Sequence, residues 1–65
     1  MRDIDRIKPF LDEFGEIWKT NFPDWRFGQL MCNLQSYVGS DLFYCEENKI
    51  LEILHNYVGD LNEWL

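Results

Sequence analysis

Two cysteines and a single histidine are the residues in this chain with the widest range of chemistry. Cys32, Cys45 and His55 are of types that bind zinc, and a cysteine–histidine pair can also serve as a nucleophile and its base. A structural zinc site needs four ligands, and the sequence has no Cys-x-x-Cys spacing to help supply them. We therefore expect two buried, reduced thiols and no bound metal. An enzyme or metal protein that uses these three residues is the rival hypothesis.

Other catalytic arrangements have no characteristic spacing in this sequence. The hydroxyl candidates are Ser36, Ser40 and Thr20. Any of them can be combined on paper with His55 and an acid, so such a triad carries no weight. The adjacent pairs Glu46–Glu47 and Asp12–Glu13 do not share a helix face, which argues against paired-carboxylate chemistry. The glycines are isolated from one another, so we expect no phosphate-binding loop, no enzyme and no bound cofactor.

Charge divides the chain into two unequal halves. Residues 1–32 contain six acidic and five basic side chains, whereas residues 33–65 contain six acidic side chains and one basic side chain. The second half therefore carries most of the net charge of −6. Because an acidic surface repels phosphate groups and anionic lipids, we expect no direct binding to nucleic acid or to a membrane. A protein with a basic surface is the complementary partner.

The sequence suggests a small protein of the cytoplasm. No apolar run approaches the ~20 residues that cross a bilayer, and the first six residues contain no apolar signal region. Its 65 residues suffice for one domain, so residues 1–65 are predicted to fold as a single unit. Five Phe, three Tyr and three Trp provide large side chains for a core in so short a chain.

Apolar residues recur at helical spacing in three segments, over about residues 9–21, 24–38 and 46–58. The predicted starts are Pro9, Asp24 and Glu46, which are residue types favoured in the first turn or at the N-cap. The predicted ends are Asn21, Gly39 and Gly59. Amphipathic helices with short connections predict an all-α fold, a compact three-helix bundle.

Two apolar segments fall outside these helices. Residues 40–45 are too apolar for a free loop and predict a packed connector, with one turn capped by Asp41. In the tail, Leu61, Trp64 and Leu65 have the spacing of one helix face and predict a short fourth C-terminal turn. That turn either covers the core or presents an exposed aromatic anchor.

The candidate partner-binding residues are charged or aromatic. They are Glu46, Glu47, Glu52, Asp60 and Glu63, which form a predicted acidic face, together with Trp64 and Arg26. The acidic face either docks onto a basic protein or only keeps the chain soluble. A cation near the start of a helix opposes the helix dipole. Arg26 is therefore expected to pair with an acid on the first or third helix, or to contact a partner.

Two runs of the sequence resemble a known group of proteins. Residues 23–34 read Pro-Asp-Trp-Arg-Phe-Gly-Gln-Leu-Met-Cys-Asn-Leu, and residues 41–47 read Asp-Leu-Phe-Tyr-Cys-Glu-Glu. They resemble short, uncharacterised bacterial and phage proteins with the pattern Pro-Asp-x-Arg-x-Gly-Gln-Leu followed by Asp-x-Phe-Tyr-x-Glu-Asp, although Glu47 replaces the last Asp. Further matching residues are Arg6, Ile7 and Trp18. The resemblance spans residues 6–58 and implies a stand-alone small domain without implying an activity.

These observations favour a small acidic protein-interaction domain as the leading hypothesis. The first alternative is a phage-encoded inhibitor that mimics nucleic-acid phosphates and blocks a host nucleic-acid-binding or defence protein. The small size and acidity of this chain are shared with phage inhibitors of bacterial defence, including those of the anti-CRISPR type. The second alternative is a structural homo-oligomer, because a core this small gains from burying more aromatic surface.

Overall fold

Within the part of the chain that the structure describes, three α-helices follow a short 3₁₀ turn. The computed structural model describes the backbone of residues 2–64 and the side chains of residues 2–62. The elements in chain order are η1 (Ile4–Arg6), α1 (Ile7–Asn21), α2 (Phe27–Val38) and α3 (Glu47–Trp64). The predicted all-α fold, a compact three-helix bundle, is confirmed.

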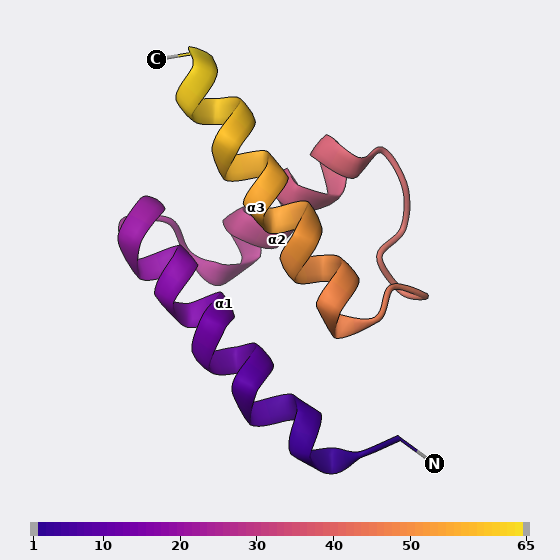
Figure 1. Ribbon diagram of the computed structural model, residues 1–65. Helices are drawn as coiled ribbons and strands as arrows, with labels where there is room; N and C mark the ends of the chain where they lie inside the picture. The colour runs from indigo at the N-terminus through magenta and orange to yellow at the C-terminus, as the bar shows by residue number, and fades with distance from the viewer. Residues whose placement is uncertain (1, 65) are drawn as a thin grey trace.

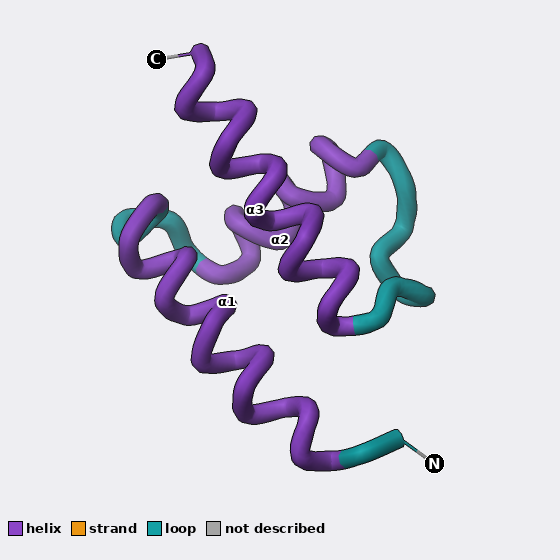
Figure 2. The backbone as a smooth tube through the Cα atoms, viewed as in Figure 1, coloured by secondary structure: helices purple, strands orange, loops and turns teal. Residues whose placement is uncertain are grey.

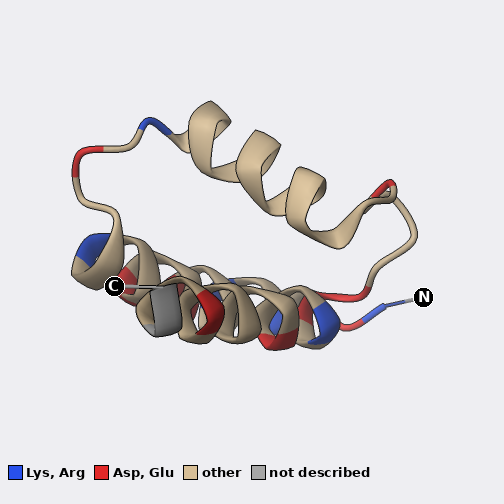
Figure 3. Cartoon of the chain, turned by 90° about the horizontal axis from the view of Figure 1, so that it is seen from above, with Lys and Arg blue, Asp and Glu red and all other residues tan. Residues whose placement is uncertain are grey.

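The helices form two layers. α1 and α3 lie side by side, and α2 crosses them on one side (Figures 1 and 3). Arg6 contacts Glu47 and Glu13 contacts His55, which is the register of two helices that run in the same direction. A short turn joins α1 to α2, and the longer loop of residues 39–46 leads from the end of α2 to the start of α3 (Figure 2).

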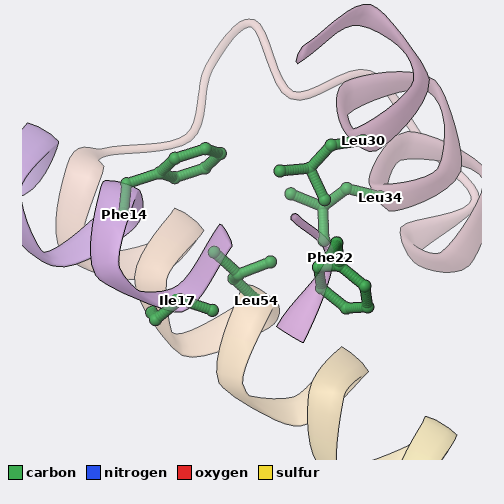
Figure 4. Packing of buried hydrophobic residues seen from close by; sticks show 6 residues of the cluster. All are labelled: Phe14, Ile17, Phe22, Leu30, Leu34 and Leu54. Carbon is green, nitrogen blue, oxygen red and sulfur yellow. The ribbon is translucent and has the colours of Figure 1, made fainter. Parts of the chain in front are cut away.

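The core lies where the three helices meet. Among the described side chains, the buried apolar residues are Phe14, Ile17, Phe22, Leu30, Leu34 and Leu54 (Figure 4). Leu30 and Leu34 from α2 and Leu54 from α3 are completely buried. Burying a leucine side chain stabilises a fold by roughly 1.5–3 kcal/mol. Leu54 holds α3 between the other two helices, since both of its neighbours contribute residues to the same cluster.

α1 begins two residues before the predicted start at Pro9. Pro9 is the third residue of the observed helix, where a missing N–H is tolerated because the first N–H groups of a helix have no intrahelical acceptor. The lead-in is a single 3₁₀ turn, capped by Asp3, whose side chain accepts a hydrogen bond from the Asp5 amide at 2.9 Å. The predicted end at Asn21 agrees with the structure.

The predicted start of α2 at Asp24 is wrong, because residues 22–25 form a turn. Phe22 is buried in this turn, its carbonyl accepts the Trp25 amide at 3.0 Å, and the two rings stack at 4.4 Å. Burial of Phe22 therefore overrides the capping preference of Asp24, and Arg26 is the N-cap instead. The predicted end is correct: Gly39 has φ of +79°, a left-handed conformation that favours glycine.

α3 does not end at Gly59 as predicted. It continues to Trp64 as one helix, so the separate fourth turn is also wrong. Gly59 lacks the positive φ of a helix-ending glycine, and Leu61 beyond it packs against the core. This packing offsets the cost of a glycine inside a helix, which is about 1 kcal/mol. Leu65 and the side chain of Trp64 lie outside the described residues.

Candidate interaction site

The loop between α2 and α3 contains a tight turn whose two central residues are aromatic. The Cys45 amide donates to the Leu42 carbonyl at 3.0 Å, which closes a β-turn with Phe43 and Tyr44 at its centre. Asp41 fixes the entry to the turn, because its Oδ1 accepts a hydrogen bond from the Phe43 amide at 3.0 Å. Leu42 packs against the core. The turn is therefore held by two hydrogen bonds and an apolar anchor.

Phe43 and Tyr44 are the most exposed large apolar side chains among those described. Their exposed fractions are 78% and 88%, and their rings meet edge-on with centroids 4.9 Å apart. The central positions of turns are normally occupied by Gly, Pro, Asn, Asp or Ser. Two aromatic rings on a fixed turn suit the binding of another protein, because aromatic anchors dominate interfaces and a preorganised backbone loses little entropy. We refer to Phe43 and Tyr44 as the aromatic pair.

Two arginines from the N-terminal segment bind the acidic residues that follow the turn. Arg2 pairs with Glu46 at 2.6 Å, and both side chains are more than half exposed. Arg6 donates to Glu47 in a more covered pair. This hydrogen bond, with a second from the Glu47 backbone, lowers the pKa of Glu47 below its ordinary value of 4.5. Glu47 therefore joins the start of α3 to η1, directly before α1, whereas the exposed Arg2–Glu46 pair contributes little to stability.

The other acidic candidates on α3 contact side chains on different helices of the chain. Lys49 lies 3.4 Å from Glu52 on the same helix. Tyr37 of α2 donates its hydroxyl hydrogen to Asp60, and this hydrogen bond raises the pKa of Tyr37 above its ordinary value of 10.0. Within residues 2–62, the predicted acidic face is divided among partners in the N-terminal segment, α2 and α3 itself. The phosphate-mimicking inhibitor stays a prediction.

Arg26 is an exposed cation at the start of α2. Its amide donates to Gln29 Oε1 at 2.8 Å, which caps the helix through the backbone. No carboxylate among the described side chains lies within ion-pair distance of its guanidinium, so the structure does not show the internal ion pair expected from the sequence. Its contact with a partner stays a prediction. The side chains of Glu63 and Trp64 lie outside the described residues.

The three residues with metal or nucleophile chemistry are not brought together. Cys32 and Cys45 are free thiols, and no group of three or more potential ligands that could hold a metal occurs in the described part of the chain. The expectation of two buried thiols is wrong, because Cys32 lies exposed on α2 and Cys45 is only half-buried. His55 lies 3.4 Å from Glu13 of α1, and α3 continues past it, so it does not cap the end of a helix.

Sequence reasoning missed the aromatic pair. Residues 40–45 were expected to pack as a connector, which holds for Leu42, and the predicted cap by Asp41 is present. The neighbouring rings of Phe43 and Tyr44 are exposed instead. The available signal was the position of two aromatic residues two and three places after the turn-forming Asp41, since connecting segments run over the protein surface.

Among the residues described, no helix combines the length and the apolar character that crossing a bilayer requires. The search for similar proteins found no match to a family model, to a curated protein or to a solved structure. The resemblance to short bacterial and phage proteins therefore stays a prediction, and the function has to follow from the geometry.

Proposed function

We propose that this chain is a small acidic protein-interaction domain of the cytoplasm that binds its partner through the aromatic pair. The observation that carries the proposal is the exposure of Phe43 and Tyr44 on a hydrogen-bonded turn. Neither ring is needed to fill the core, since Leu42 alone anchors the loop there. The partner is expected to offer an apolar pocket that receives the two rings.

The charged residues around the aromatic pair indicate which residues should border the pocket of the partner. Asp41 precedes the pair and Glu46 follows it, and both side chains are exposed. Among the described side chains, Glu46 is bound only by Arg2, in an exposed pair that a cation of a partner can replace at little cost. Basic residues beside the pocket therefore complement this end of the molecule. Among the acidic candidates, Glu46 is placed to contact such a partner, whereas Glu47 is occupied by Arg6.

The proposal is tested by comparing capture of cellular proteins by three forms of the chain. These are the native chain, the double variant Phe43→Ser/Tyr44→Ser, and the control Ile4→Ser, which removes an exposed aliphatic side chain from another segment. A protein captured at physiological salt by the native chain and the control, but not by the double variant, is then purified. Its dissociation constant for the double variant should rise at least about 30-fold, the equivalent of one interface hot spot.

Two results would count against the proposal. One is that the native chain and the double variant capture the same proteins in equal amounts. The other is that Ile4→Ser weakens binding as much as the double variant, which would place the contact on η1 rather than on the turn.

A further inference from the structure

The outer side of α2 is built entirely from uncharged residues. Residues 27–40 contain no acidic or basic side chain, and Figure 3 shows charge only beyond the two ends of the helix. Two shallow hollows of about 500 and 490 Å³ lie along it and meet at Cys32. Gly28, Cys32 and Ser36 follow at intervals of four, so a row of small side chains runs along this face between the longer polar side chains that also line the hollows. We call this surface the neutral face.

Charges of opposite sign border the neutral face at its two ends. Arg26 precedes the helix, is exposed and has no carboxylate partner among the described side chains. Its position opposes the helix dipole, so it does not serve the stability of α2. Asp41 follows the helix, is exposed, and has no cation within ion-pair distance in the same part of the chain. The face is thus neutral in the middle, positive at one end and negative at the other.

We propose that the neutral face binds the same face of a second copy of this chain, with the two α2 helices antiparallel. A twofold axis near Cys32 and Asn33 brings Arg26 of each copy to Asp41 of the other, which forms two equivalent ion pairs. The small residues along the middle allow the two helices to approach closely. Such a pairing gives a partner to Arg26 and to Asp41, neither of which has one among the described side chains.

The overall charge favours this face over other contacts between two copies. Each chain carries −6, so most arrangements of two copies bring acidic residues together. On the neutral face the charges at the ends are complementary in the antiparallel arrangement and repulsive in the parallel one. This contact does not use Phe43 or Tyr44, so it stands independently of the proposed function.

Mixing two charge variants tests the pairing by sedimentation equilibrium. Arg26→Asp opposes Asp41 in its own dimer, and Asp41→Arg opposes Arg26, so each variant alone should self-associate at least about tenfold more weakly than the native chain. An equimolar mixture restores two opposite-charge contacts and should form a heterodimer. Lys19→Asp and Asp24→Asn change exposed charges outside the proposed contacts and should leave self-association unchanged.

Two further variants keep the test decisive. If Asp41→Arg disturbs the turn, Asp41→Asn retains a side-chain acceptor for the Phe43 amide and should still weaken self-association. In a Cys45→Ser background, a short bismaleimide should link Cys32 of one copy to Cys32 of the other, whereas Cys32→Ser should give no linked dimer. A native chain that stays monomeric up to millimolar concentration would overturn the proposal. So would a mixture of the two charge variants that does not associate.

Discussion

The two layers of the bundle share one core but differ in how they use their polar side chains. α1, with the η1 turn before it, and α3 carry many charged residues, and several of these bind one another: Arg6 of η1 pairs with Glu47, and Glu13 lies beside His55. α2 carries no charged residue, and Tyr37 provides its one side-chain hydrogen bond to another helix among the described residues. The difference indicates that charged pairs help to align α1 and α3, the first layer, whereas α2, the second layer, joins them mainly through apolar packing.

The largest expected loss of stability comes from a substitution in the core that both layers share. Leu54→Ala leaves a cavity beneath α2 and beside α1, because Leu54 is completely buried in the common cluster. We expect a loss of about 2–5 kcal/mol in the free energy of unfolding, measured by urea denaturation. Since small domains have only about 5–15 kcal/mol in total, the variant should be largely unfolded on mild heating. A loss below about 1 kcal/mol would show that α3 is not held at this position.

Arg26→Asp should raise the stability of the chain, in contrast to Leu54→Ala, because it improves the N-terminal end of α2. Asp is a good N-cap and favours the positive end of the helix dipole, whereas Arg opposes it. We expect this variant to stabilise the monomer by about 1 kcal/mol, measured by thermal unfolding at low protein concentration. Lys19→Asp provides the control, because Lys19 lies in the last turn of α1, where a cation is favourable and its reversal should destabilise. Lower stability of Arg26→Asp would assign Arg26 an internal structural role.

The Arg6–Glu47 pair should make the stability of the chain depend on pH in the acidic range. The pKa of Glu47 is lowered by its hydrogen bond with Arg6, so the pair stabilises the fold above the ordinary value of 4.5. That contribution is lost as pH falls through the lowered value. We expect Glu47→Gln to be less stable than the native chain at neutral pH and to approach it at acidic pH, in denaturation series across this range. Glu46→Gln should show a smaller difference, because the Arg2–Glu46 pair is more exposed. Equal acid profiles for the two variants would contradict this distinction.

The hydrogen bond between Tyr37 of α2 and Asp60 of α3 should contribute less to stability at alkaline pH. The hydrogen bond to Asp60 raises the pKa of Tyr37, so the contribution of this bond is fully present below the ordinary value of 10.0. It is lost as pH rises through the raised value. Tyr37→Phe keeps the ring against Tyr57 but removes the hydroxyl group. The stability difference between the native chain and this variant should therefore shrink in alkali, whereas Tyr44→Phe should give no such change. A difference that is independent of pH would show that the Tyr37–Asp60 bond does not form in solution.

The sequence predicted the elements of this fold better than their boundaries. The apolar spacing indicated three helices, and Gly39 marked an end because a left-handed residue is needed there. Asp24 and Gly59 misled because local preferences of about 1 kcal/mol were outweighed by the packing of Phe22 and Leu61. Such packing depends on residues distant in the sequence, which local patterns do not reveal.

The candidate site was less accessible to sequence reasoning, for two physical reasons. Apolar residues in a connector predict burial, and only the turn geometry distinguishes buried Leu42 from exposed Phe43 and Tyr44. The sequence predicts one acidic face because it shows where the acidic residues lie but not which side chains bind them. The binding of Glu47 by Arg6 requires α1 and α3 to run in parallel, and no local pattern in the sequence indicates that arrangement.

The free energy of unfolding of Phe43→Ser/Tyr44→Ser, measured by urea denaturation beside the native chain, distinguishes a binding role of the aromatic pair from a structural one. If the aromatic pair serves binding and the core holds the fold, the two free energies should agree within about 0.5 kcal/mol, the usual range for surface substitutions. A loss of about 2 kcal/mol or more, the scale of a buried aromatic or aliphatic side chain, would contradict the account and assign the pair to the fold.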